Sequence, residues 1–415
     1  MNEVISKPGG VITDAELREL VASGVSQIEL EGKTVAIIIP DDTRSCPLPE
    51  LLSAVYEPVI ERAKEVTCVI ALGTHEYLSE SEIARWVGGD PAQRYPGMPI
   101  INHEFKDPET FVTVGRISDE RMNELTNGLL AEGADIIINK VVAEADVQII
   151  IGPVLPHEVV GMSGGNKYFI PGVAHADMIS RTHWVGALIT SASIIGTTGI
   201  TPVRAMINDG SAFIPGEHYA LCVVVKSHTT DLECAVFGDP QFAWREAAEV
   251  AAETHVVYVD EPFTRVISEI PDRYHDIWTA AKGFYKTEPA MADDGEVILY
   301  APHISEVSEV HDEIYEIGYH CRDYFVGQWD RFKDYKWGVL AHSTHLAGAG
   351  TYDPETGVEK LRVRLTFATR IPPEVCEKIN VGYLDPDTID LELERRRGDT
   401  VIIEDAGEVL FRLRK

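Results

Sequence analysis

The fold is decided by residues 34–44, which read TVAIIIPDDTR: a run of apolar and β-branched residues that ends abruptly in charged ones. Such a run is typical of a strand buried on both faces of a sheet. Two more runs have the same form, residues 66–72 before a loop with His75 and residues 147–152 before a loop with His157. Three buried strands that each end in a polar loop predict an α/β fold with a ligand site at the carboxyl edge of its sheet.

Helical patterns alternate with these strands over the first two-thirds of the chain, which favours a mostly parallel sheet with helices on both faces. Thr13 and Glu16 have the spacing of a capping box at the start of a helix. The other elements expected in this part are helices at 49–64, 79–87 and 241–255 and strands at 134–139 and 218–226.

The pattern changes after residue 265, because residues 265–290 predict a long polar helix. The later strand-like runs are 296–301, 338–341, 360–368 and two short ones within 400–412. A chain of 415 residues is long for one core. We therefore expect an N-terminal α/β domain at 1–270 and a smaller C-terminal α/β domain at 275–400, with the active site in the cleft between them. The tail 401–415 is expected to return to the first domain.

Composition narrows the class of protein. A net charge of −31 argues against a nucleic-acid partner, because the average field of the protein would repel the phosphate groups of the nucleic acid. No apolar run approaches the roughly 20 residues that cross a bilayer, and no signal peptide is recognisable at the N-terminus, so we expect a cytoplasmic protein without a membrane partner. The six cysteines form no CxxC pair, which favours reduced buried thiols over disulfides or a zinc ribbon.

The three strand-end loops carry Arg44, His75 and His157. A single histidine at the end of a strand is more often structural, but three ionisable loops at one sheet edge favour a site. Arginine binds a carboxylate with two parallel hydrogen bonds, and two imidazoles supply acid and base near neutral pH. The loops therefore predict acid–base chemistry on a carboxylate-bearing substrate.

A glycine-rich segment follows at residues 161–172, which read GMSGGNKYFIPG. A Ser-Gly-Gly turn can present backbone N–H groups to a phosphate. The spacing is not that of a Walker A loop, and no GxGxxG follows a strand, which counts against a conventional dinucleotide site. Taken by itself, the segment predicts that Lys167 binds a phosphate. It predicts no special role for His183, sixteen residues later, which would be a surface or helix histidine.

The series DxTR, GTH, PH, GxSGGxKxxxPG and a later single histidine, over roughly residues 30–300, resembles the lactate racemase family. The resemblance implies that Lys167 carries a nickel-pincer nucleotide (pyridinium-3-thioamide-5-thiocarboxylic acid mononucleotide) through a thioamide. It also implies that His183 is the one protein ligand to the nickel, which two sulfurs and a ring carbon hold otherwise; sulfur donors with an imidazole suit Ni(II). The residues expected to contact the cofactor besides Lys167 are Asp41, Ser163, Gly164 and Gly165.

The resemblance further implies that His75 and His157 are the catalytic acid and base, and that Arg44 binds the substrate carboxylate. Asp41 is expected to orient other groups, and His103 is open between a structural and a functional role. Further substrate contacts are expected from Trp278, Thr279 and Lys282, although the family pattern has Tyr-Gln where this chain has Trp278 and Thr279. Alternatively, Lys282 is a solvated lysine on a helix with no contact to the substrate.

These expectations describe a racemase or epimerase that inverts C2 of a 2-hydroxy acid by proton-coupled hydride transfer to the nucleotide, which cofactor-maturation enzymes would supply. Polar side chains around the second domain favour a sugar acid, an aldonate such as gluconate, over a lactate- or malate-type acid. They are His303, Ser305, Glu306, His311, His342 and His345.

Three other interpretations stay open. The four histidines of that group could form a metal site of their own. His75, His157 and His183 could serve a zinc-dependent hydrolase, although no HExxH motif is present. The chain could also be a non-catalytic carrier of the nucleotide, which would keep Lys167 but would not need two strand-end histidines.

Overall fold

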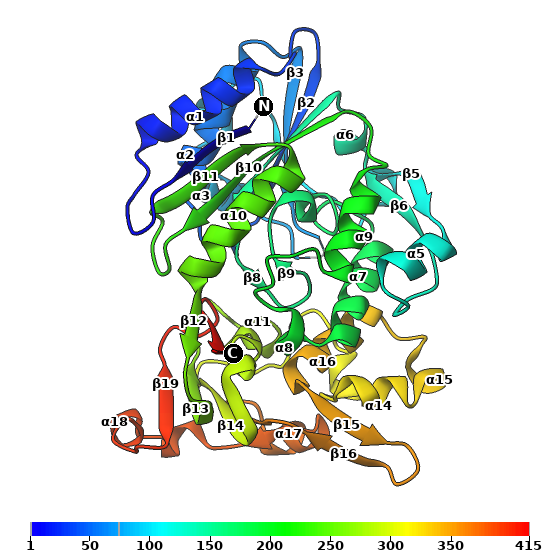
Figure 1. The fold of residues 1–415 in the computed structure, drawn as a ribbon, viewed down its shortest axis with the longest axis vertical. Coiled ribbons are helices and arrows are strands. Elements are labelled where there is room, and N and C mark those ends of the chain that lie inside the picture. The colour runs from blue at the N-terminus through cyan, green and yellow to red at the C-terminus, as the bar shows by residue number, and fades with distance from the viewer. Residues whose placement is uncertain (1, 74, 415) are drawn as a thin grey trace. The chain divides into compact units, whose positions relative to one another are not determined.

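Residues 2–73 and 75–414 are described by the computed structural model (Figure 1), and Thr74 of the GTH motif lies outside them. The chain divides into two compact units. The first runs to His157 and resumes over Gly161–Thr182 and Thr197–Thr254. The second takes Glu158–Val160, His183–Gly196 and the chain from His255 onward. The second unit thus begins earlier than the expected boundary at 270–275, and it includes His183, which the expected division put in the first domain.

The first unit is built on a seven-stranded sheet with the order β1-β11-β10-β7-β2-β3-β4. Its strands are β1 (Asn2–Ser6), β2 (Thr34–Pro40), β3 (Glu65–Ala71), β4 (Ile100–Asn102), β7 (Val147–Pro153), β10 (Glu217–Val225) and β11 (Leu232–Gly238). Pairing is parallel from β10 to β4, and β11 is antiparallel to both of its neighbours. The expected α/β fold with a mostly parallel sheet is therefore confirmed, with an antiparallel edge that was not predicted.

The strand order reverses between β2 and β7. From β2 the chain adds β3 and β4 on one side, and from β7 it adds β10 and β11 on the other. In open α/β sheets the carboxyl ends of the strands at such a point are where ligands bind. The predicted loops after β2, β3 and β7 all leave this edge of the sheet.

The helices of the first unit confirm the expected alternation. They are α1 (Asp14–Ser26), α2 (Leu48–Ile60), α3 (Glu80–Trp86), α4 (Pro91–Arg94), α5 (Asp119–Leu125), α6 (Lys140–Ala143), α9 (Pro202–Ser211) and α10 (Pro240–His255). The capping box at Thr13 and Glu16 is formed, and α1 lies beside α2 (Figure 1). A further helix, α7 (Ala176–Ile189), begins in the first unit and ends in the second.

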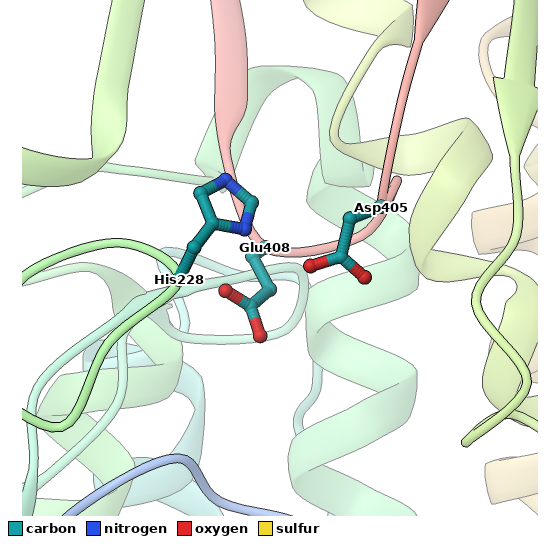
Figure 2. A group of neighbouring side chains, drawn as sticks. All are labelled: His228, Asp405 and Glu408. Carbon is teal, nitrogen blue, oxygen red and sulfur yellow. The ribbon is translucent and has the colours of Figure 1, made fainter.

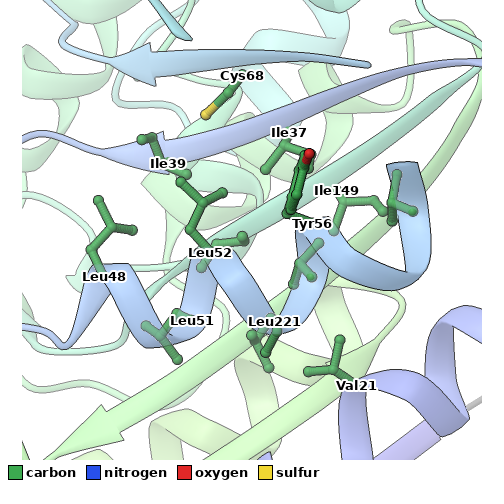
Figure 3. Packing of buried hydrophobic residues seen from close by; sticks show 14 of the residues in the cluster. Val21, Ile37, Ile39, Leu48, Leu51, Leu52, Tyr56, Cys68, Ile149 and Leu221 are labelled. Atoms are coloured by element: carbon green, nitrogen blue, oxygen red, sulfur yellow. The ribbon is translucent and has the colours of Figure 1, made fainter. Parts of the chain in front are cut away.

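One face of the sheet packs on α1 and α2 in a single apolar cluster (Figure 3). Ile37 and Ile39 of β2 point to this face, and they meet Leu48 and Leu52 of α2. Ala36 and Ile38 point to the other face and are fully buried as well. Because both faces are covered, the strand reads as an unbroken apolar run, which is why the sequence identified it so clearly.

One predicted strand lies elsewhere. β6 (Ala134–Asn139) forms, but it pairs with β5 (Phe111–Ile117) in a separate antiparallel ribbon and not with the main sheet. A short strand has the same composition in either place, so the choice of partner depends on contacts that are distant in sequence.

The second unit contains a five-stranded parallel sheet with the order β18-β17-β14-β13-β19. Its strands are β13 (Phe263–Glu269), β14 (Met291–Ala301), β17 (Arg364–Thr369), β18 (Gly382–Tyr383) and β19 (Thr400–Ile403). Beside it are the pair β12 (Val256–Val259) and β20 (Leu410–Leu413) and the hairpin β15 (Gly350–Asp353) and β16 (Val358–Leu361). Its helices are α8 (Ser191–Ile194), α11 (Ile277–Ala280), α12 (Lys282–Tyr285), α13 (Ile314–Ile317), α14 (Arg322–Val326), α15 (Trp329–Phe332), α16 (Trp337–Ala347), α17 (Pro373–Lys378) and α18 (Leu391–Arg395).

Two predictions for this region are wrong. The long polar helix at 265–290 is instead strand β13 followed by the short helices α11 and α12. The strand at 338–341 is the first part of helix α16, whose residues from Val339 to Ala347 are all buried. A helix that is buried on every side shows no amphipathic period, and a short apolar run in it cannot be told from a strand.

The C-terminal tail belongs to the second unit. Its two predicted short strands form as β19 and β20, and they pair with β13 and β12, which the expected division placed at the end of the first domain and which lie in the second unit. The loop between β19 and β20 carries Asp405 and Glu408 (Figure 2). The Arg273 guanidinium holds this loop, because it lies 2.6 Å from the Asp405 carboxylate and 3.2 Å from the Glu408 carboxylate. The Lys286 ammonium also donates to the carbonyl of Glu408 at 2.8 Å.

Two expectations from composition can be compared with the structure. All six cysteines lie among the described residues, and each is buried with a free thiol. Over residues 2–73 and 75–414, no helix combines the length and the apolar character that spanning a bilayer requires.

Candidate functional site

The structure brings Asp41 and His75 together at the carboxyl edge of the first sheet. The Asp41 carboxylate follows β2 and is 4% exposed, and its Oδ2 lies 2.6 Å from Nδ1 of His75. Its other oxygen, Oδ1, accepts hydrogen bonds from the hydroxyl and the N–H of Thr43. Burial opposes ionisation of this group, but His75, Arg44 and Thr43 outweigh burial and hold the pKa of Asp41 well below its usual value.

The Asp41 carboxylate determines which ring nitrogen of His75 can accept a proton. An ionised carboxylate can only accept, so Nδ1 carries a proton and Nε2 of the neutral ring is the acceptor. The His75 side chain is 52% exposed, whereas the carboxylate behind it is buried. This arrangement of a buried acid behind an accessible imidazole is that of a general base held in one orientation.

Arg44 lies between this pair and the glycine-rich segment. It is half-buried, and its charge acts on Asp41, on Cys46 and on Tyr168, which follows Lys167. The loop after β3 is also tied to that segment, because the N–H of Gly73 donates to the carbonyl of Gly172 at 2.9 Å. Three of the predicted regions are therefore joined in the first unit.

His157 lies on β8 (Pro156–His157), which follows β7 and pairs with β9 (Gly161–Met162). Its side chain is 7% exposed, so it is far more enclosed than His75. The β8–β9 hairpin leads directly into the Ser-Gly-Gly turn. Since β7 is the neighbour of β2, the two histidines come from strands on either side of β2.

The Ser-Gly-Gly turn has a backbone that only glycine can adopt without strain. Gly164 has φ +84° and Gly165 has φ +58°, and a Cβ at either position would lie under 3 Å from Val154 or Trp244. Ser163 closes the turn, because its Oγ accepts from the N–H of Leu155 at 2.9 Å. Residues 161–166 are buried, while Lys167, in the 3₁₀ turn Gly165–Tyr168, keeps part of its surface.

Arg204 of α9 supports this turn from beneath, and the sequence did not single it out. Its guanidinium is 1% exposed, donates to the carbonyls of Gly164 and Met162, and stacks on Trp244 at 4.2 Å. Burial lowers the pKa of Arg204 to about 9. An arginine among the apolar residues Val203, Met206 and Ile207 was the available signal, because a buried arginine needs acceptors.

Replacing Arg204 with methionine is expected to lower the free energy of unfolding by about 2–6 kcal/mol, since two buried carbonyls lose their donor at roughly 1–3 kcal/mol each. Guanidinium denaturation of the protein without cofactor measures this. Arg245→Met on α10 is the matched control, because Arg245 is 61% exposed and pairs with Glu246. Equal small effects of the two substitutions would contradict a supporting role for Arg204.

His103 has a structural role. The ring is buried, with Nε2 3.4 Å from the carbonyl of Ala174 and Nδ1 3.1 Å from the amide of Asn139. Burial lowers the pKa of His103 to about 4, so the ring is neutral and connects two loops. These contacts favour the structural alternative for His103.

The second unit contributes a group of histidines around His183 of α7. His342 and His345 of α16 are both buried, and His183 is an electrostatic neighbour of each. Burial, then His345, His311 and His183, lower the pKa of His342 well below its usual value. Burial likewise lowers the pKa of His345 to about 4, so both rings are neutral.

Trp278 belongs to the same group. Its ring stacks on His342 with 3.7 Å between centroids and packs on His311 at 4.1 Å. Thr279 lies within α11, and its N–H and hydroxyl both donate to the carboxylate of Asp276, the residue that caps the helix. The substrate contacts expected from Trp278 and Thr279 stay a prediction.

The other polar residues predicted around the second domain have different partners or are exposed. Nε2 of His303 lies 3.0 Å from the carbonyl of Tyr274, and Ser305 and Glu306 are exposed. Lys282 lies over the ring of Tyr274 at 4.7 Å. Within the described parts of the chain, His303, His311, His342 and His345 do not bring three ligand atoms within 4.8 Å of one another, which counts against a metal site of their own.

A sequence model of the lactate racemase N-terminal domain matches residues 10–196. A lactate racemase of Thermoanaerobacterium thermosaccharolyticum is 28% identical over 279 residues, which are 65% of this chain and 60% of that protein. The lactate racemase of Lactiplantibacillus plantarum is 30% identical over 156 residues, 36% of this chain and 32% of that protein. Residues 10–196 therefore correspond to the N-terminal domain of the lactate racemase family.

Two solved structures share the fold of this chain. A crystal structure of a protein from Thermotoga maritima has 31% identity and a TM-score of 0.86, and the match covers 97% of this chain and 99% of that one. The lactate racemase apoprotein of Thermoanaerobacterium thermosaccharolyticum has the same fold, with a TM-score of 0.73 at 18% identity over 99% of this chain and 94% of that one. The sequence matches span less than two thirds of the two lactate racemases.

Two observations fit the nucleotide that the lactate racemase resemblance implies. Lys167 is partly exposed at the end of the Ser-Gly-Gly turn, as attachment of a group through its amine requires. In the second unit, His183 is an electrostatic neighbour of His342 and His345, and imidazole nitrogens are donors that suit Ni(II).

Proposed function

We propose that the chain is a racemase or epimerase that inverts C2 of a 2-hydroxy acid, with a sugar acid as its substrate. The observation that carries this proposal is the Asp41–His75 pair at the switch point of the sheet, in a chain whose residues 10–196 correspond to the N-terminal domain of the lactate racemase family. An accessible imidazole with a fixed tautomer is suited to exchanging a proton with a hydroxyl group.

In this proposal a nickel-pincer nucleotide is attached to Lys167, and when bound it supplies the acceptor for the hydrogen on C2. The residues of the chain do the rest. Arg44 binds the substrate carboxylate through two parallel hydrogen bonds. Nε2 of His75 takes the hydroxyl proton of one enantiomer, and His157 does so for the other, because inversion exposes opposite faces of C2. His183 holds the metal through one ring nitrogen.

The substrate preference rests on the second unit. A lactate methyl group would leave the polar rings of His342 and His345 unpaired, at roughly 1–3 kcal/mol for each buried group. Hydroxyl groups of a longer sugar acid would pair with them. A sugar acid therefore fits these surroundings better than lactate does.

The test uses protein produced together with the cofactor-maturation enzymes. We expect a mass increment on Lys167, about one nickel per chain, and inversion at C2 in a panel of chiral 2-hydroxy acids. We expect kcat/KM for a five- or six-carbon aldonate to exceed that for lactate by more than about tenfold, the ratio that 1.4 kcal/mol gives. Equal or better turnover of lactate would contradict the sugar-acid assignment, and no inversion with any 2-hydroxy acid would contradict the racemase itself.

A further inference from the structure

The side chain of Tyr168 lies against the backbone of β7, the strand next to β2 in the first sheet. It contacts Gly152, near the carboxyl end of the strand, where a Cβ would lie 2.1 Å from the Tyr168 hydroxyl oxygen and 2.3 Å from the ring carbon that bears it. Gly152 pairs regularly with its neighbour on β10, so it is needed for space and not for an unusual backbone. Glycine weakens a strand, and it is kept where another group approaches closely. The sheet therefore leaves room for this phenol.

The backbone on both sides of Tyr168 is held in place within the first unit. The 3₁₀ turn Gly165–Tyr168 contacts β2 and β7. The next residue, Phe169, is fully buried, and its ring lies 4.9 Å from that of His218. The carbonyl of Lys167 accepts from the N–H of Gly172 at 3.1 Å. The phenol is thus positioned before a ligand arrives, which lowers the entropic cost of binding.

The surroundings of the phenol are those of the proposed substrate site. Its electrostatic neighbours are Arg44, Cys46, Asp41 and Cys222, all in the first unit. Arg44 is the cation of these four, and the Asp41 carboxylate is already paired with His75 and Thr43. An anion that binds to Arg44 would therefore lie close to the Tyr168 hydroxyl as well.

The Tyr168 hydroxyl is a hydrogen-bond donor at neutral pH. Burial raises the pKa of Tyr168 well above its usual value, although the charge of Arg44 acts in the opposite direction. Over residues 2–73 and 75–414, no group accepts a hydrogen bond from this hydroxyl, and part of the Tyr168 surface is accessible. A carboxylate has about four lone-pair sites, of which a guanidinium fork uses two. One of the others can accept from the phenol.

We propose that Tyr168 is a substrate-binding residue whose hydroxyl donates to the carboxylate that Arg44 binds. This inference rests on the proposed racemase function, and it adds a second contact to the substrate carboxylate from the residue that follows Lys167. The carboxylate keeps its charge during inversion at C2. The contact therefore stabilises the bound substrate and the transition state equally, and it contributes to affinity and not to the rate of the chemical step.

The experiment measures kcat and KM of cofactor-loaded Tyr168→Phe with the 2-hydroxy acid that the wild-type enzyme inverts best. Phenylalanine keeps the ring on Gly152 and removes the O–H. We expect KM to rise by about tenfold to a hundredfold, the effect of a lost hydrogen bond to a charged group, while kcat changes by less than about threefold. Tyr219→Phe is the matched control, because that hydroxyl donates to Glu217 at 2.7 Å near the start of β10. It should leave both constants unchanged.

Two further measurements do not depend on activity. The intact mass of Tyr168→Phe should show the full increment on Lys167, because the hydroxyl binds the substrate and not the cofactor. Loss of the increment would show that the hydroxyl binds the phosphate of the nucleotide instead. The unfolding midpoint of the cofactor-free protein should be unchanged, because the O–H has no partner in the chain to lose. A lower midpoint would show that the hydroxyl supports the fold.

Either of those two results would overturn the inference. A lower kcat at unchanged KM would overturn it as well, since the hydroxyl would then act on the proton transfer. If the wild-type enzyme with its adduct inverts no 2-hydroxy acid, the proposed function fails and takes this inference with it. If the wild-type enzyme inverts one and Tyr168→Phe has the same KM, this inference fails alone.

Discussion

Lys167→Ala is expected to carry no mass increment and to show no racemisation above the uncatalysed background. The amine of Lys167 is the proposed point of attachment, and the cofactor performs the step that amino-acid side chains cannot. The measurement is the intact mass of protein made with the maturation enzymes, together with chiral chromatography of the product. Lys140→Ala on α6 of the same unit is the control, because Lys140 is 41% exposed and should keep both the adduct and the activity.

His183→Ala separates the metal from the nucleotide in the same experiment. This variant is expected to retain the increment on Lys167 and to lose nickel, because it removes a ligand and leaves the attachment point. A full increment in Lys167→Ala, or one nickel per chain in His183→Ala, would contradict the assignment of these two residues.

Asp41→Asn and His75→Ala are each expected to lower kcat by about 10²–10⁴, the usual contribution of a general base. An asparagine amide can donate to Nδ1, which would move the ring proton to Nε2 and remove the acceptor that the substrate hydroxyl needs. Since the two residues act as one unit, the double variant should be no slower than His75→Ala alone. Both single variants should keep the adduct on Lys167.

The kinetics of the double variant test whether Asp41 and His75 act together or independently. If the losses in the Asp41→Asn, His75→Ala double variant multiply, Asp41 has a function that does not pass through His75. The cofactor contact expected for Asp41 from the sequence would then regain support. Near wild-type turnover in Asp41→Asn would instead show that the tautomer of His75 does not matter.

The parts of the site that the sequence predicted are those that follow a buried strand. Thr34–Pro40 is apolar because both faces of β2 are covered, and it ends where the polar loop with Asp41 begins. Parallel strands bring such loops to one edge, so Asp41 and His75 could be expected close together. The hydrogen bond between them could not, because its partners come from loops 34 residues apart whose shapes are set by tertiary contacts.

The second unit was harder to predict, for a physical reason that α16 illustrates. Its residues from Val339 to Ala347 are buried on every side, including two histidines, so hydrophobicity shows neither a helical stripe nor a strand alternation. The stack of Trp278 on His342 joins segments that are remote in sequence. Arg204 was missed likewise, because its carbonyl acceptors lie about forty residues earlier in the chain.

The way the second unit is assembled from the chain bears on how the protein is made. Its sheet needs β19 beside β13, and β12 pairs with β20, which ends at Leu413. It also takes in Glu158–Val160 and His183–Gly196, which are synthesised much earlier. Domains generally fold as units while the ribosome elongates the chain at about 5–20 residues per second. The first unit has all of its residues once Thr254 has emerged, whereas the early segments of the second must wait for β19 and β20. Premature termination before Thr400 would therefore release chains with a finished first unit and a second unit that lacks the edge strand β19 of its sheet and the partner of β12.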